Sequence, residues 1–158
     1  MRPSKSSPFD GREAFHAAVI EALDASRRAI TMVDHDFSSW PLESAAGERA
    51  LRDALRRGAT LRLLVSERGW LERHGSRFRR LRREQAHRVE CRQIPPNLRV
   101  DESALVADGQ HLVRRARWDR FAGHLAIATT SEVEPLVERY DSVWDESEPC
   151  LAATTLGL

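Results

Sequence analysis

Hydrophobic side chains recur along the chain with two different periods, which predicts an alternation of helices and strands. Phe15, Val19 and Leu23 lie four residues apart, as on one buried face of a helix. Leu61, Leu63 and Val65 alternate with other positions, as in a strand. The two patterns predict helices over residues 10–26, 44–57, 70–86 and from 131 onwards, and strands over 29–33, 60–65, 89–94, 103–107, 111–116 and 124–129.

The order of these elements predicts the fold class. Helices and strands alternate at first, three strands then follow one another, and a helix closes the chain. Asp108-Gly109 between two of those strands is a strong signal for a tight hairpin. We therefore expect an α/β fold: a single domain with a mixed β-sheet flanked by helices. We expect a disordered leader over residues 1–9, the domain over 10–148 and a C-terminal tail over 149–158.

Composition narrows the class of protein. The chain has 158 residues, 41% of them hydrophobic and 31% charged, which suits one globular domain. Its apolar runs are far shorter than the roughly 20 residues that span a bilayer, so we expect no membrane association. Cys91 and Cys150 lie 59 positions apart without a Cys-x-x-Cys pair, which excludes a disulfide framework and a zinc knuckle. We expect a cytoplasmic protein without cofactor or metal.

The net charge of +1 hides a strong asymmetry. Residues 68–92 hold nine Arg against three Glu, whereas residues 132–158 hold seven acidic residues against one Arg. Four of these arginines would lie along one side of the predicted helix and are candidates for binding a nucleic-acid backbone: Arg73, Arg77, Arg80 and Arg83. The alternatives are a solvated helix face, or ion pairs with the acidic final helix.

Several segments resemble the phospholipase D superfamily. Arg57-Gly58-Ala59-Thr60-Leu61-Arg62-Leu63-Leu64-Val65 is similar to its "RGVxVRxLVD" helix-to-strand step, and Tyr140-Asp141-Ser142-Val143-Trp144 resembles its closing aromatic helix. The hairpin is similar to the strand pair that carries the signature His-x-Lys-(x)4-Asp. The resemblance implies half of a two-unit phospholipase D-like fold, so a single unit would form a homodimer to build one site.

The signature itself is degenerate in this sequence. If Asp108 matches the motif's Asp, then Asp101 stands at the place of the nucleophilic His and Ser103 at that of the Lys. A carboxylate repels an anionic phosphodiester, and a serine supplies no countercharge. Arg115-Ala116 stands where the family has Gly-Ser. Asp108 has a second explanation, because Asp before Gly is favourable in a hairpin turn.

Other polar residues are candidate ligand contacts. Asp34-His35-Asp36 follows a strand, where ligands of open α/β sheets gather. A metal there would need distant ligands such as His111 or His124, and a hydrogen-bonded loop is the alternative. The candidate ligand-binding residues are His35, Arg99, Arg114 and Arg117.

Three functions are compatible with these patterns. The leading hypothesis is a non-catalytic, homodimeric module that binds a phosphate-bearing ligand or a protein partner. The second is a phosphodiesterase or nuclease that uses non-standard catalytic residues, namely Asp101, Asp108 and His124. The third is a purely structural interaction domain. Convergence of the three candidate catalytic residues in one cleft would favour the enzyme.

Overall fold

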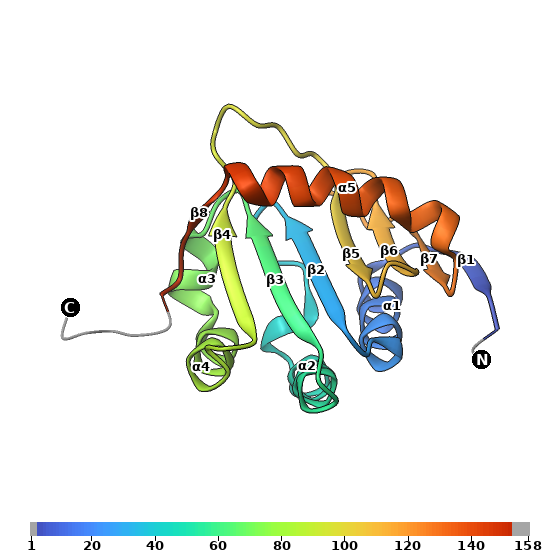
Figure 1. The fold of residues 1–158 in the computed structure, drawn as a ribbon, viewed down its shortest axis with the longest axis horizontal. Coiled ribbons are helices and arrows are strands. Elements are labelled where there is room, and N and C mark those ends of the chain that lie inside the picture. The colour runs from blue at the N-terminus through green and yellow to red at the C-terminus, as the bar shows by residue number, and fades with distance from the viewer. Residues whose placement is uncertain (1–2, 153–158) are drawn as a thin grey trace.

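The computed structural model describes residues 3–152, which form one mixed sheet between two layers of helices (Figure 1). The elements in chain order are β1 (Lys5–Phe9), α1 (Arg12–Ala25), β2 (Ala29–Asp34), a short 3-10 helix η1 (Pro41–Glu43), α2 (Ala45–Arg56), β3 (Thr60–Val65), α3 (Gly69–His74), α4 (Ser76–Glu84), β4 (Val89–Gln93), β5 (Ser103–Ala107), β6 (His111–Arg115), β7 (Gly123–Ile127), α5 (Thr130–Glu146) and β8 (Glu148–Pro149).

The sheet has eight strands in the order β1-β7-β6-β5-β2-β3-β4-β8. The three strands β2, β3 and β4 run parallel, and every other neighbouring pair is antiparallel. This is the predicted single α/β domain with a mixed sheet. The carboxyl ends of β2, β3 and β4 therefore lie side by side at one end of the strands. The loop from β4 to β5 extends beyond that end (Figure 1).

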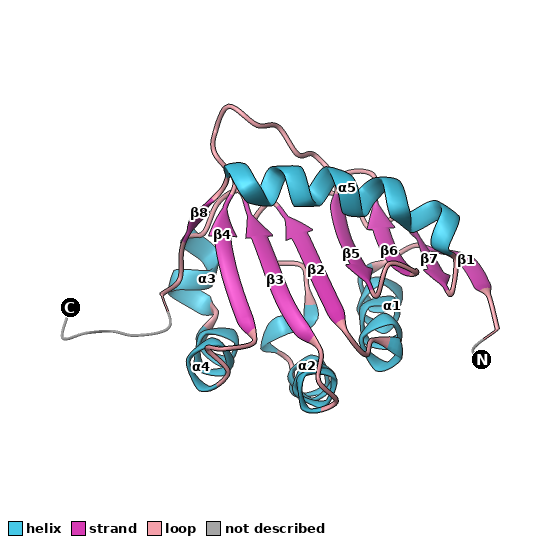
Figure 2. Cartoon of the chain, in the orientation of Figure 1, coloured by secondary structure: helices cyan, strands magenta, loops and turns pink. Residues whose placement is uncertain are grey.

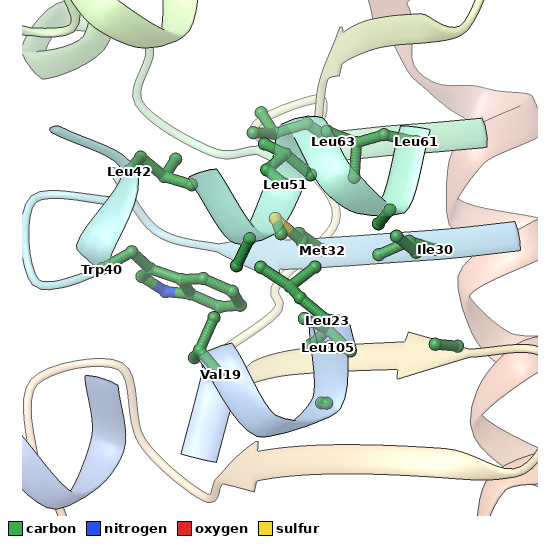
Figure 3. Close-up of a cluster of buried hydrophobic side chains, with 14 of the residues drawn as sticks. Val19, Leu23, Ile30, Met32, Trp40, Leu42, Leu51, Leu61, Leu63 and Leu105 are labelled. Carbon is green, nitrogen blue, oxygen red and sulfur yellow. The ribbon is translucent and has the colours of Figure 1, made fainter. Parts of the chain in front are cut away.

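Each face of the sheet has its own hydrophobic core. Helices α1 to α4 cover one face and α5 crosses the other (Figure 2). On the first face, Leu23 of α1 and Leu51 of α2 pack over Met32 of β2 (Figure 3). On the second face, Val33 and Trp144 belong to a separate buried cluster. Because both faces are covered, central strands such as β5 are buried along their whole length.

Strands β1 and β8, at the two edges of the sheet, differ from the sequence-based expectation. The predicted disordered leader over 1–9 is wrong for Lys5–Phe9, which pairs antiparallel with β7. Gly123 of β7 permits this pairing, because a Cβ there would lie 2.4 Å from the Phe9 ring. At the other edge, Glu148–Pro149 pairs with β4 inside the predicted tail, and residues 153–158 of that tail lie outside the described residues.

The arginine-rich segment forms two helices rather than one. Helix α3 ends at His74 and α4 begins at Ser76, with Gly75 between them. A Cβ at Gly75 would lie 2.6 Å from the Leu71 carbonyl oxygen, so this close turn requires glycine.

None of the described helices is both long enough and apolar enough to span a bilayer.

Candidate functional site

A fully buried arginine lies where β2, β5 and β6 meet. The guanidinium of Arg115 contacts a carboxylate oxygen of Asp34 at 3.4 Å, and both side chains are almost completely buried. The same guanidinium nitrogen donates to the hydroxyls of Ser39 (2.8 Å) and Ser103 (2.9 Å). The other terminal nitrogen donates to the backbone carbonyls of Trp118 and Arg120 at 3.1 and 2.9 Å. We call Asp34, Ser39, Ser103 and Arg115 the Arg115 cluster.

Aromatic side chains and burial set the electrostatics of the Arg115 cluster. The guanidinium carbon lies 4.1 Å from the centre of the Phe15 ring and 5.1 Å from that of Phe121. Burial lowers the pKa of Arg115, and the nearby charge of Asp34 acts in the opposite direction. The guanidinium group is so basic that it stays protonated in proteins even when burial lowers its pKa. The Arg115 cluster therefore holds a permanent buried cation beside one carboxylate.

Asp34 also shapes the loop that follows β2. One of its carboxylate oxygens accepts hydrogen bonds from the backbone N–H groups of Asp36 (3.0 Å) and Phe37 (2.7 Å). Phe37 has a φ of 65°, so the loop turns sharply there. The indole of Trp40 then donates to the Ser103 hydroxyl at 3.0 Å. Asp34 therefore joins the loop after β2 to the Arg115 cluster. Of the two possibilities for Asp34-His35-Asp36, a metal site and a hydrogen-bonded loop, the structure has the hydrogen-bonded loop.

A cleft of about 430 Å³ opens at the carboxyl ends of the parallel strands β2, β3 and β4. His35 and Trp118 form part of its lining, and their rings stack with centroids 3.9 Å apart and an interplanar angle of 15°. Arg99 and Asp101 lie on the loop after β4 and form an exposed ion pair at 3.0 Å. Ser66 and Glu67, on the loop after β3, also line it. We call this space, between the loops after β2, β3, β4 and β6, the edge cleft.

The structure separates the three candidate catalytic residues. Asp101 borders the edge cleft. Asp108 lies at the opposite end of β5, where its carboxylate accepts hydrogen bonds from the backbone N–H groups of Arg27, Arg28 and Ala29. His124 contacts Ser6 at 3.0 Å and Glu132 of α5 at 3.4 Å, so it belongs to the α5 face of the sheet.

The candidate ligand-binding residues are separated as well. His35 and Arg99 line the edge cleft. Arg117 lies on the loop that also carries Trp118 and pairs with Asp119 at 3.1 Å. Arg114 is paired in register with His124, and both line an apolar cavity of about 660 Å³ beside α5. Among residues 3–152, no group of three or more His, Cys, Asp and Glu side chains could hold a metal ion.

The arginine-rich face of α4 is partly neutralised by another helix. Glu48 of α2 contacts Arg77 at 2.7 Å, Arg80 at 3.3 Å and Arg52 at 2.9 Å. These hydrogen bonds, led by that of Arg52, lower the pKa of Glu48 to about 2. One alternative drawn from the sequence was pairing with the acidic final helix, but that helix lies on the other face of the sheet. Arg73 and Arg83 are exposed.

The sequence patterns missed the central role of Arg115. The structure pairs Ser103 and Arg115 directly opposite each other across β5 and β6. The resemblance drawn from the sequence expects a Lys at position 103, whereas the cation of this cross-strand pair is Arg115 of the neighbouring strand. A signal was present in β6, where His111, Val113 and Arg115 alternate and should share one face.

Solved structures of phospholipase D superfamily members share this architecture. Nuc from Salmonella typhimurium, described as a phospholipase D family member, has a TM-score of 0.72 and 14% identity over 94% of this chain and 99% of its own. NucT from Helicobacter pylori has a TM-score of 0.64 and 10% identity over 94% of this chain and 100% of its own. The chain therefore has a phospholipase D-like fold.

Three further comparisons concern an archaeal protein, the curated proteins and the sequence family. TrmBL2, an archaeal chromatin protein with a novel mode of DNA binding, has a TM-score of 0.69 and 18% identity over 92% of this chain, which spans 54% of TrmBL2. No curated protein matches the chain by sequence. A family model described as a domain of unknown function (DUF7931) matches residues 11–156, and the chain belongs to that family.

Removing the Arg115 cation should destabilise the fold strongly. In Arg115→Leu the Asp34 carboxylate is left buried without its cation, which costs about 3–5 kcal/mol in comparable cases. In Asp34→Asn/Arg115→Leu the loss should be smaller than the sum of the two single losses. Urea unfolding of the unaltered protein, Asp34→Asn, Arg115→Leu and the double variant measures this coupling. The exposed Arg117→Leu is the control and should change stability by less than about 0.5 kcal/mol. Additive single losses would contradict the interpretation.

Glu48 should make stability depend on pH in the acid range. Its folded-state pKa of about 2 lies below the ordinary 4.5, so the charged form is bound more tightly in the folded state. Its contribution is complete above about pH 5 and is lost as pH falls towards 2. Glu48→Gln should therefore cost on the order of 2–3 kcal/mol at pH 7 and little at pH 2. Urea unfolding over this pH range, with the exposed Glu13→Gln as control, measures it. A pH-independent difference would refute this role.

Proposed function

We propose that the chain is a non-catalytic, homodimeric module with a phospholipase D-like fold, which binds a phosphate-bearing ligand in the edge cleft. The observation that carries this proposal is the complete burial of Arg115 against Ser103. At the place where the family resemblance expects a lysine, the chain has a buried hydroxyl whose oxygen accepts from Trp40 and Arg115. The cation of this cross-strand pair is directed into the protein interior and is occupied by protein acceptors.

The chemistry at the rim of the cleft argues against phosphoryl transfer. Asp101 stands at the place of the nucleophilic histidine, and its carboxylate is engaged with Arg99 at 3.0 and 3.1 Å. An anionic nucleophile is repelled by an anionic phosphate unless cationic groups lie beside that phosphate. Those cationic groups have to be in place before the reaction begins. Ser103 provides none, and Asp108 is about the length of β5 away. The arrangement lacks both the neutral nucleophile and the preorganised cation.

The same cleft suits binding of a phosphate-bearing ring. Arg99 is 82% exposed and Arg117 is half-exposed, and exposed ion pairs of this kind contribute only about 0–1 kcal/mol. Phosphate oxygens can therefore replace their present carboxylate partners. The stacked rings of His35 and Trp118 offer a flat surface for a nucleobase, as in many single-strand binding sites. A volume of about 430 Å³ suits one nucleotide.

Nucleic acid is the form of this ligand that we favour. Single-stranded nucleic acid combines phosphates with stackable bases, which matches the two kinds of side chain in the edge cleft. TrmBL2, with which the chain shares a fold, is a chromatin protein that binds DNA. The face of α4 is a weaker candidate, because Arg77 and Arg80 already pair with Glu48.

Binding without turnover is the expected result with a labelled oligothymidylate. Fluorescence anisotropy should show an affinity that falls with salt, by a slope of about −0.7 for each phosphate contact. Arg99→Gln/Arg117→Gln should flatten that slope by about 1.4, and Trp118→Ala should weaken binding by roughly 5- to 150-fold. Arg73→Gln/Arg83→Gln, which removes two arginines from the α3–α4 face, is the matched control and should change neither.

Two results would overturn this prediction. If the control variant loses binding and the cleft variants keep it, the nucleic-acid interface is the α3–α4 face. If bis(p-nitrophenyl) phosphate or the oligonucleotide is hydrolysed, and turnover disappears in Asp101→Ala or His124→Ala, the protein is the phosphodiesterase of the second hypothesis.

Dimerisation should be visible by sedimentation equilibrium at tens of micromolar. Leu98 is a partly exposed apolar side chain at the rim of the edge cleft, and a second copy would cover it. We expect a mass of twice the 18.0 kDa of one chain. Leu98→Asp should shift the equilibrium towards the monomer, whereas Ala86→Asp, an exposed position near α4, should not. A single-chain mass for the unaltered protein would rule out the homodimer.

A further inference from the structure

The two cysteines, far apart in the sequence, face each other across the last strand pair of the sheet. Strands β4 and β8 are antiparallel with Arg92 opposite Pro149 and Gln93 opposite Glu148. One step further in the same register, Cys91 lies opposite Cys150. The backbone N–H of Cys150 donates to the carbonyl of Cys91 at 3.0 Å, so the antiparallel pairing extends to these residues.

Both cysteine side chains lie on the same face of the sheet. Cys91 is 1% exposed within the core that α1 to α4 cover, and Cys150 is a partly buried member of the same cluster. Directly opposed, hydrogen-bonded residues of an antiparallel pair have a Cα separation of about 5.5 Å, which is within the range that disulfides span. Their Cβ atoms, about 4.5–5.5 Å apart, have to approach by up to about 1 Å to reach the Cβ separation of a disulfide. Both residues are free thiols here.

We propose that Cys91 and Cys150 form an intramolecular disulfide under oxidising conditions, which fastens β8 and the end of α5 to the edge of the sheet. Strand β8 has only two residues, so its attachment to β4 is weak without a cross-link. Helix α5 precedes it directly and covers the second face of the sheet. The cross-link would therefore hold the C-terminal end of that cover in place. This inference does not depend on the proposed ligand.

The oxidant that the proposal requires is a small-molecule disulfide such as oxidised glutathione. The Cys150 thiolate attacks one of its sulfurs, which forms a mixed disulfide and releases one glutathione thiolate. Cys91, as thiolate, then attacks the Cys150 sulfur, which forms the protein disulfide and releases the second glutathione. Two protein thiols are oxidised and one disulfide is reduced, and the two thiol protons end on the two glutathione molecules. Cys150 reacts first because it is the more exposed of the two.

The environment of the thiols makes the exchange slow. Burial raises the pKa of Cys91 to about 12 and that of Cys150 to about 11. Thiolates are the reactive species, so only a small fraction of either residue reacts at neutral pH. Thiols of high pKa are also poor leaving groups, so the completed disulfide should resist reduction once formed. In a reducing compartment the pair stays as thiols.

The experiment treats the folded full-length protein with oxidised glutathione, blocks free thiols with N-ethylmaleimide, and measures intact mass and peptide maps. We expect a chain lighter by the two thiol hydrogens, with Cys91 and Cys150 in one cross-linked peptide. Thermal unfolding of the oxidised protein should occur about 5–15 °C higher than that of the reduced protein, and dithiothreitol should reverse the shift. Cys150→Ala is the matched control and should show no shift on oxidation.

Three outcomes would refute the proposal. They are two alkylated cysteines after prolonged oxidation, a stable single glutathione adduct on Cys150, and a disulfide between two chains. Because Cys91 is buried and its replacement could disturb folding, the conclusion rests on Cys150→Ala and on the peptide map.

Discussion

The buried charge of Arg115 constrains the end of the sheet at which the edge cleft opens. Arg115 has no solvent to stabilise its guanidinium, so the protein has to supply acceptors from several elements at once. Asp34 comes from β2, Ser103 from β5, and two carbonyls from the loop after β6. Removing any acceptor leaves a buried charge less satisfied, which is far more costly than losing a surface contact. Three strands and two loops are therefore held in one arrangement by a single side chain.

The Arg115 cluster also explains how the position of a cation can change the chemistry of a fold. Ser103 and Arg115 face each other in register on β5 and β6. The small side chain of Ser103 leaves room for the long side chain of Arg115, so this pair contains one cation. That cation points between Phe15 and Phe121 and into the helical layer. Charge that is satisfied inside the protein is not available to a phosphate outside it.

The sequence predicted the central elements well and the edges of the sheet poorly, for physical reasons. The buried strands and the hairpin at Asp108-Gly109 follow from hydrophobic period and turn chemistry, and the structure has them where expected. Lys5–Phe9 and Glu148–Pro149 are mostly exposed edge strands, so backbone pairing defines them and no hydrophobic pattern reports them. The partner of the α4 arginines was likewise unpredictable, because Glu48 reaches them only through the packing of α2 beside α4.

The sequence indicated only part of the candidate site. It placed His35 after a strand, at the end of the sheet where ligands of open α/β sheets gather. It did not predict that Arg99 and Asp101 line the same cleft. Asp108 was assigned by motif position, yet its carboxylate caps three backbone N–H groups ahead of β2 at the other end of β5. A motif spacing along one strand fixes which face and which end each residue occupies. It does not fix which neighbouring strand supplies the partner, and here the partner of Ser103 is Arg115 of β6, whose charge is directed into the protein interior.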